Sequence, residues 1–154
     1  MTIVRNALAG DEKFCRELYY STRRAEVSAF GWEKDTAERF LTMQFTSRER
    51  AYHLQYPDLI DSIVELDGIP IGRLITSPAE RSLVLIDIAL LPDHQRSGIG
   101  TRLVTELQAE ASALGKRVIL RVDKSNLIAA VFYKKLGFEV EDQNQINYSM
   151  SWQV

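Results

Sequence analysis

The segment "DHQRSGIGTRL" (Asp93–Leu103) places two glycines, Gly98 and Gly100, at the start of an amphipathic pattern. Glycine costs a helix about 1 kcal/mol relative to alanine, so two at a helix start need a structural reason. A strand that runs through this segment into a helix leaves unpaired N–H groups at the helix N-terminus, where the helix dipole adds partial positive charge. Without Cβ atoms the backbone can close on an anion. The segment therefore predicts either a phosphate-binding loop or a tight glycine turn that binds nothing.

The residues on both sides of this segment predict a strand-helix-strand crossover. Before it, "RSLVLIDIALL" (81–91) is a nearly continuous apolar run, which is typical of a central strand covered on both faces. After it, apolar residues recur at helical spacing until Gly115, and "RVILRV" (117–122) is again strand-like. The recurring positions are Ile99, Leu103, Leu107, Ala111 and Leu114.

The remaining segments complete a mixed α/β pattern. The second expected helix begins at Asp35, which forms a capping-box variant with Glu38, and Asp67-Gly68 predicts a type I′ hairpin turn. The other expected elements are a strand at 2–7, helices at 11–31 and 35–57, hairpin strands at 59–66 and 69–76, a helix at 126–137 capped by Asn126 and ended by Gly137, and strands at 138–142 and 145–154. The predicted order is βααβββαβαββ, a mixed sheet with helices on its faces and a single domain over residues 1–154.

Composition narrows the functional classes. The 154 residues are 45% hydrophobic and 26% charged, and the formal net charge is −2 with no basic block, so we expect no nucleic acid or anionic membrane as partner. The single Cys15 cannot form an internal disulfide, and only two histidines, His53 and His94, are present, so we expect no metal site. The first residues do not resemble a signal or transit peptide and no apolar run has the length of a membrane span, which favours the cytoplasm.

Two motifs carry a resemblance to a known family. The stretch "LLPDHQRSGIGTRL" (90–103) resembles the acetyl-coenzyme A signature of the GCN5-related N-acetyltransferases (GNAT), Gln/Arg-x-x-Gly-x-Gly/Ala, here Gln95, Gly98 and Gly100. A second block, "NLIAAVFYKKLGF" (126–138), resembles the family's Asn-x-x-Ala-x-x-Phe-Tyr-x-x-x-Gly-Phe. The expected element order is also that of the family. The loop departs from the family pattern at Arg96 and Ser97, where Gly and Lys are common.

The resemblance implies a set of residues for acetyl-coenzyme A. The pantetheine arm would pair with the main chain of the central strand, so the apolar side chains there are read as core and only their N–H and C=O groups as functional. Asn126 is either a coenzyme contact or an ordinary helix N-cap. The implied coenzyme residues are Ile88, Ala89, Leu90, Gln95, Arg96, Ser97, Gly98, Ile99, Gly100, Thr101, Asn126 and Tyr133.

Acetyl transfer to an amine needs a neutral amine, a stabilised oxyanion and a proton for the departing thiolate. Tyr133 matches the family tyrosine that supplies this proton, although it could also be a packed helix tyrosine. Asp87 lies within the apolar central run, where a buried carboxylate is costly unless it is paired or used, so it is either the base, directly or through water, or a structural group. Glu65 is a weaker alternative base, whereas His94 and Cys15 are expected outside the mechanism.

The resemblance thus implies an enzyme that moves acetyl from acetyl-coenzyme A to a primary amine, of a small molecule or a peptide, by direct attack in a ternary complex. The alternative is a coenzyme-binding regulatory module with the same fold and no turnover. A homodimer could form through the last strands. Aromatic residues of the first two helices either line the acceptor pocket or belong to the core, and these are Tyr19, Tyr20, Phe30, Trp32, Tyr52 and Tyr56.

Overall fold

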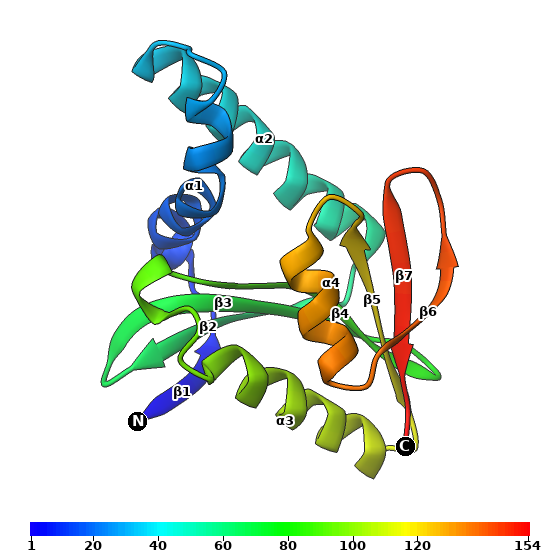
Figure 1. Ribbon diagram of the computed structural model, residues 1–154. Helices are drawn as coiled ribbons and strands as arrows, with labels where there is room; N and C mark the ends of the chain where they lie inside the picture. Colours follow the sequence, from blue (N-terminus) through cyan, green and yellow to red (C-terminus); the bar gives the residue numbers. More distant parts are fainter. The chain divides into compact units, whose positions relative to one another are not determined.

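The computed structural model describes residues 1–154 and confirms the predicted order of elements (Figure 1). The strands form one seven-stranded mixed sheet in the order β1-β2-β3-β4-β5-β7-β6. The elements are β1 (Thr2–Asn6), α1 (Glu12–Ser28), α2 (Lys34–Gln55), β2 (Ile60–Leu66), β3 (Ile69–Pro78), β4 (Ser82–Leu90), α3 (Ile99–Ala113), β5 (Arg117–Asp123), α4 (Leu127–Lys135), β6 (Glu139–Gln143) and β7 (Asn147–Trp152), with 3-10 turns η1 (Ala9–Asp11) and η2 (Pro92–His94). No helix combines the length and the apolarity that crossing a membrane requires.

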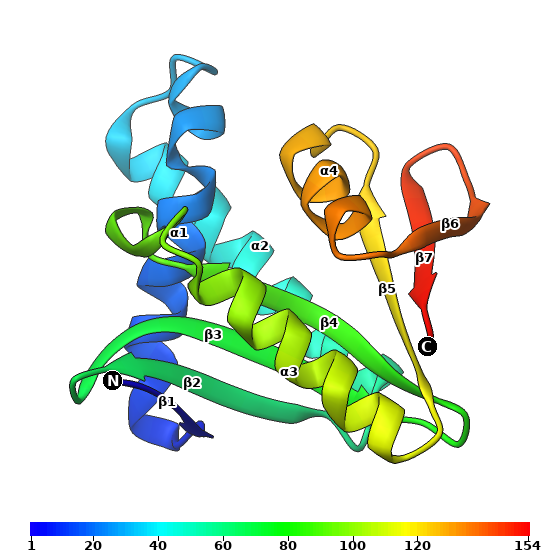
Figure 2. The same cartoon turned by 60° about the horizontal axis from the view of Figure 1, so that its bottom comes forward.

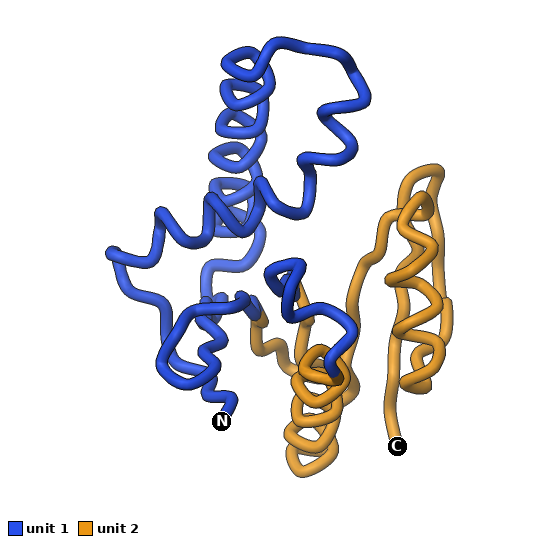
Figure 3. The backbone as a smooth tube through the Cα atoms, turned by 60° about the vertical axis from the view of Figure 1, so that its left-hand side comes forward, with its two compact units in different colours: residues 1–75, 87–97 blue, residues 76–86, 98–154 orange.

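Two compact units share the chain (Figure 3). Unit 1 consists of residues 1–75 and 87–97, and unit 2 consists of residues 76–86 and 98–154. The boundary between them runs through β3 and β4. A single domain over residues 1–154 stays a prediction.

Unit 1 contains an antiparallel arrangement that begins with β1 and β2, which pair from Thr2↔Leu66 to Asn6↔Ser62 (Figure 2). The β2–β3 turn has positive φ at Asp67 (51°) and Gly68 (82°), as the predicted type I′ turn requires. Helices α1 and α2 bury apolar side chains against β2. This cluster consists of Cys15, Tyr19, Val27, Leu41, Phe45 and Ile63.

The predicted start of α2 is wrong by one residue, and its predicted cap is wrong as well. The helix begins at Lys34 with Glu33 as N-cap residue, and the first helical bond runs from the Ala37 N–H to the Glu33 carbonyl. Asp35 lies inside the first turn, and no side chain caps the helix. An acidic residue in that turn is still favourable because it faces the positive end of the helix dipole. The helix ends at Gln55, before Pro57, as predicted.

Unit 2 contains the strand-helix-strand crossover. The first half of β4 pairs in parallel with β5, from Ser82↔Arg117 to Leu85↔Leu120, and β5 pairs antiparallel with β7. The Asn126 side chain caps α4 by accepting a hydrogen bond from the Ala129 N–H at 3.1 Å. Gly137 follows α4 with a φ of 94°, so both predicted ends of this helix are confirmed.

The second half of β4 is held close to β3 by a glycine. A Cβ atom on Gly72 would lie 2.6 Å from the Ala89 carbonyl oxygen and 2.6 Å from Leu90 Cδ2. Real Cβ atoms do not approach so closely, so only glycine permits this spacing. Along β4 no residue is fully exposed, which agrees with the predicted central strand.

Candidate active site

The glycine loop exposes a run of unpaired backbone donors. Arg96 and Gly98 have left-handed backbone conformations, with φ of 60° and 87°, and the first helical hydrogen bond of α3 runs from the Arg102 N–H to the Gly98 carbonyl. None of the N–H groups from Arg96 to Thr101 donates a hydrogen bond within the protein. This backbone can therefore bind an anion with several N–H groups at once, at the positive end of the α3 dipole.

Side chains within the loop stabilise this conformation. Gln95 donates from Nε2 to the carbonyl oxygen of Leu90 at 3.0 Å. The Ser97 hydroxyl donates to the carbonyl oxygen of His94 at 2.7 Å. Both bonds run back toward the preceding chain, so these side chains shape the loop and leave its N–H groups available. Arg96 is exposed.

The strand before the loop supplies the other part expected for a coenzyme. The ladder between β4 and β5 covers Ser82–Leu85 and does not extend to Ile88, Ala89 and Leu90. On the other edge of β4 lies β3. Just after these residues, the Leu91 N–H donates to the Ile71 carbonyl of β3 at 2.8 Å. The main chain of these three residues thus has a strand partner on one edge alone, as pairing with an extended ligand would require.

Asp87 lies one residue before this stretch and faces α2. Its Oδ2 is 3.7 Å from Nη1 of Arg48, and its side chain is 22% exposed. Burial raises the pKa of Asp87; the positive charges of Arg48 and Arg73 oppose this rise and the negative charge of Glu49 reinforces it. Burial, with the nearby Asp87 charge, raises the pKa of Tyr52 to about 12. Asp87 is therefore a carboxylate whose environment favours proton uptake, which a base requires.

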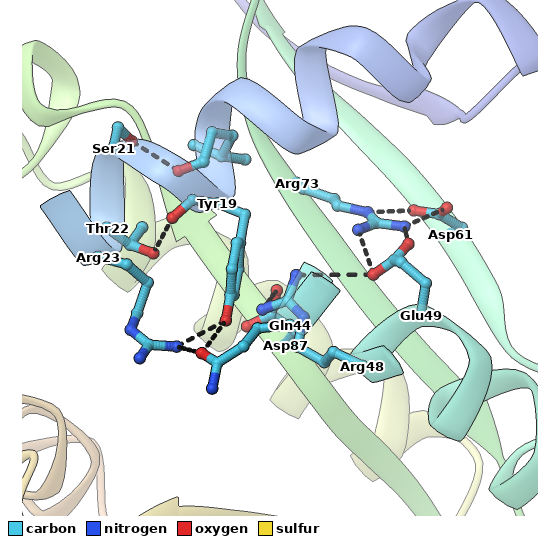
Figure 4. Close-up of polar contacts among 11 residues, drawn as sticks. Tyr19, Ser21, Thr22, Arg23, Gln44, Arg48, Glu49, Asp61, Arg73 and Asp87 are labelled. Atoms are coloured by element: carbon cyan, nitrogen blue, oxygen red, sulfur yellow. Dashed lines mark hydrogen bonds and ion pairs between the residues drawn. The ribbon is translucent and has the colours of Figure 1, made fainter. Parts of the chain in front are cut away.

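Next to Asp87 lies an ion-pair cluster that the sequence analysis did not include (Figure 4). Arg73 of β3 is buried and donates hydrogen bonds to both oxygens of Asp61 and both oxygens of Glu49, at 2.6–3.0 Å. Burial lowers the pKa of Arg73, but these bonds outweigh it and the pKa rises, so the guanidinium stays charged. The signal was present in the sequence, because Arg73 interrupts an apolar strand just as Asp87 does.

Arg48 is the second residue that sequence reasoning missed. Its guanidinium lies 4.4 Å from the centre of the Tyr19 ring and 5.4 Å from that of Tyr52. It makes long ion pairs to Glu49 at 3.6 Å and to Asp87 at 3.7 Å and no hydrogen bond to the protein, and its buried Nε has no partner. In the sequence it belongs to the charged run "SRER", which reads as a solvated helix face.

Helix α4 positions the predicted acid. Tyr133 is 8% exposed and packs against the rings of Phe132 and Phe138, with centroids 5.2 and 5.6 Å away. A tyrosine in such packing has a fixed position, which suits either a structural or a proton-donating role. The Asn126 cap is confirmed, whereas its contact with a coenzyme stays a prediction.

Glu65, the weaker alternative base, has a structural partner, and Cys15 lies in the core as expected. Glu65 accepts a hydrogen bond from Arg5 Nε at 3.0 Å, and Arg5 also binds both oxygens of Asp11. The Arg5 bond lowers the pKa of Asp11 to about 2. Cys15 is buried, and burial raises the pKa of its thiol to about 11, which fits packing.

The aromatic residues predicted for an acceptor pocket lie in several places, with Tyr52 beside Arg48 and Tyr56 at the C-cap of α2. Tyr19 is buried in the α1–α2 core. Tyr20 and Trp32 line a groove of about 550 Å³ between the C-terminal part of α1 and the N-terminal part of α2, and Phe30 contacts the Trp32 ring at 5.0 Å between centroids. The predicted set is thus not one pocket lining.

Comparison with known proteins agrees with this architecture. The sequence pattern of the Acetyltransferase (GNAT) family matches residues 17–138, and the chain belongs to this family. It is 26% identical over 147 residues to the uncharacterized N-acetyltransferase MJ1207 of Methanocaldococcus jannaschii, covering 90% of this chain and 61% of that protein. It is 29% identical over 126 residues to the ribosomal protein bS18 alanine N-acetyltransferase of Escherichia coli, covering 78% of this chain and 71% of that protein.

The fold is also that of a solved structure with coenzyme A bound. The PaiA N-acetyltransferase of Thermoplasma acidophilum in complex with coenzyme A superimposes with a TM-score of 0.76 at 19% identity, over 100% of this chain and 99% of that one. This likeness confirms the predicted fold. In the present chain, no group of three or more His, Cys, Asp or Glu side chains is arranged to hold a metal ion.

Proposed function

We propose that the protein is an acetyltransferase that moves the acetyl group of acetyl-coenzyme A to a primary amine. The observation that carries the proposal is the run of unpaired N–H groups from Arg96 to Thr101 at the start of α3. Each charge-assisted bond from such a group to a phosphate is worth roughly 1.5–3 kcal/mol, so several together could hold a pyrophosphate. Family membership supports the acetyl donor.

In this proposal the coenzyme contacts follow the chain from β4 into α3. The main chain at Ile88–Leu90 pairs with the pantetheine arm, and the loop N–H groups bind the pyrophosphate. Gln95 and Ser97 act indirectly, because their side chains hold the loop in shape.

The chemistry then needs two proton transfers. The amine nitrogen attacks the acetyl carbonyl carbon, the carbon–sulfur bond breaks, and the products are an amide and the free thiol of coenzyme A. Asp87 accepts the proton that the amine loses, directly or through water, and Tyr133 donates a proton to the departing sulfur. The raised pKa of Asp87 suits the first role.

Thiol release from acetyl-coenzyme A, measured with a panel of amines and peptides, tests the proposal. We expect release that depends on the acceptor, and Tyr133→Phe should lower kcat by about 10²–10⁴-fold without weakening coenzyme binding, because it keeps the ring and removes the proton. A coenzyme-induced melting shift with no thiol release for any acceptor would instead support a regulatory module. Near-normal turnover in Tyr133→Phe would show that this side chain only packs.

A further inference from the structure

Arg48 and Asp87 form a pair of opposite charges that stays partly open to solvent. The two side chains are 25% and 22% exposed, and the contact of 3.7 Å is too long for a hydrogen bond. Both lie in unit 1, Arg48 on α2 and Asp87 on β4. The pair therefore offers a cation and a carboxylate, side by side, to a molecule that reaches Asp87.

A comparison with Arg73 shows that Arg48 has unused donors. The guanidinium of Arg73 donates four hydrogen bonds to two carboxylates, and its side chain is 5% exposed, so it serves the structure. Arg48 has the same five N–H groups but no hydrogen bond to the protein, and its guanidinium lies over the Tyr19 and Tyr52 rings. A guanidinium that aromatic rings hold in place and that has unused donors is suited to bind a carboxylate or carbonyl oxygen.

The spacing of the pair fits an amine that carries an oxygen on the adjacent carbon, and among such groups a planar guanidinium favours a carboxyl-derived oxygen. By standard backbone dimensions, the amino nitrogen of an α-amino acid lies roughly 2.7–3.6 Å from its carboxyl oxygens. This matches the 3.7 Å between Arg48 Nη1 and Asp87 Oδ2, so the amine can bind the aspartate while the adjacent oxygen binds the arginine. A polyamine or another simple amine has no oxygen to place at Arg48.

We propose that Arg48 and Asp87 together bind the α-amino acyl head group of the acceptor, an amine with a carboxyl-derived oxygen on the next carbon. The inference rests on the proposed function, since it assigns the acceptor of that reaction. Asp87 takes the ammonium group and Arg48 takes the oxygen. The head group can come from a free amino acid or from the N-terminus of a peptide, because both carry the amine and the oxygen on one carbon.

The test compares each acceptor with its decarboxylated amine. Thiol release is measured for alanine against ethylamine, phenylalanine against phenethylamine and lysine against cadaverine, with alaninamide and short peptides as separate arms. We expect kcat/KM to be about 10- to 100-fold higher for the compounds with the oxygen, the value of a charge-assisted bond. If kcat/KM is higher for free amino acids than for peptides, the acceptor is a free amino acid with its carboxylate. If it is higher for peptides, the acceptor is a chain N-terminus. Either order supports the head-group proposal.

Variants separate recognition from structure. Arg48→Met should bring the preference ratio close to one, and Arg48→Lys should retain part of it because the charge remains without the planar fork. Arg50→Met, an exposed arginine of the same helix, should keep the full ratio. A merely structural Arg48 would lower all rates together and leave the ratio unchanged, which would overturn the inference.

A binding assay keeps this result distinct from failure of the proposed function. With coenzyme A present, alanine or an alanyl peptide should raise the melting temperature of the wild type and not that of Arg48→Met, even if no acetyl transfer occurs. Simple amines that are acetylated as fast as their amino acid counterparts would overturn the head-group proposal while leaving the acetyltransferase intact. The head-group proposal would also be overturned if compounds with the head group neither raise the melting temperature of the wild type nor accept an acetyl group.

Discussion

Two single-methyl substitutions, Gly98→Ala and Gly100→Ala, should change stability in opposite directions. Gly98 has a φ of 87° and no atom lies within 4 Å of the position that its Cβ would occupy, so the substitution has a backbone cost and no steric one. Gly100 lies in the first turn of α3, where a Cβ would make an ordinary 3.7 Å contact with Phe132 Cζ. The two sites therefore distinguish the cost of a left-handed backbone from the effect of adding a side chain.

The magnitudes follow from these environments. A left-handed conformation costs a residue with a Cβ roughly 1–2 kcal/mol, and 1 kcal/mol shifts the Tm of a domain of this size by roughly 2–4 °C, so Gly98→Ala should lower Tm by roughly 2–8 °C. Alanine in place of a helical glycine gains up to about 1 kcal/mol, so Gly100→Ala should raise Tm by up to about 4 °C.

The same pair tests the anion-binding loop. At one hundred times its dissociation constant, a coenzyme stabilises the fold by about 2.7 kcal/mol, or roughly 5–11 °C. Gly98→Ala should lose most of this shift, because its Cβ stands on the open side of the loop and the strained backbone reorients the N–H groups. Gly100→Ala should retain it, since the family pattern accepts alanine there, whereas the larger Gly100→Val should lose it.

Differential scanning fluorimetry with and without acetyl-coenzyme A measures both effects, with isothermal calorimetry for affinity. If Gly98→Ala has an unchanged Tm and a full coenzyme-induced Tm shift, both the left-handed conformation of Gly98 and the anion-binding loop are refuted. A wild type whose Tm does not move at millimolar acetyl-coenzyme A would refute coenzyme binding itself.

Three further substitutions, with Arg117→Met as a control, test other parts of the structure. Burial raises the pKa of Asp87, so the acidic limb of the kcat/KM profile should lie above the range of a free aspartate and disappear in Asp87→Asn; an unchanged profile would assign Asp87 to structure. Because the pKa is raised in the folded state, the protonated carboxyl stabilises the fold at low pH and this contribution is lost as pH rises through the folded-state pKa, so the Tm of Asp87→Asn relative to wild type should increase with pH. Arg73→Met leaves two carboxylates that are 22% and 25% exposed without their partner, and it should lower the free energy of unfolding by about 3 kcal/mol. Arg117→Met removes an exposed ion pair and should lower it by under about 1 kcal/mol. Chemical denaturation measures both values, and equal losses would contradict the buried role of Arg73. Gly72→Ala must displace β4 near Leu90, so both the Tm and the coenzyme shift should fall, and a wild-type melting curve would contradict the close approach.

Features set by local chemistry were predictable from the sequence. The Asp67-Gly68 turn and the Asn126 cap each depend on a few adjacent residues, and the structure confirms both. The positive φ of Gly98, which the sequence pattern did not specify, is a further reason for a glycine at that position. The element order followed from hydrophobic periodicity, which survives in any fold that buries one face of each element.

The start of α2 was less predictable because several acidic residues compete for it. Glu33 and Asp35 both precede or open the helix, and a side-chain signal alone favoured Asp35. The backbone bond from the Ala37 N–H to Glu33 decides the start, without any capping side chain. The Asp35 side chain does not cap the helix, so the side-chain signal misplaced its start.

The two arginines of the candidate site show where prediction from one sequence ends. Arg73 could have been singled out, because a charge in an apolar strand demands a partner, but its partners lie 12 and 24 positions away and only the fold brings them together. Arg48 gave no such signal, since arginine is ordinary on a helix next to glutamate. Its distinction is a lack of hydrogen bonds in a place where the neighbouring arginine has four. The chain gives one buried guanidinium four hydrogen bonds and leaves the adjacent one without any beside a carboxylate, and this contrast is the reason for proposing that the acceptor supplies the missing partner.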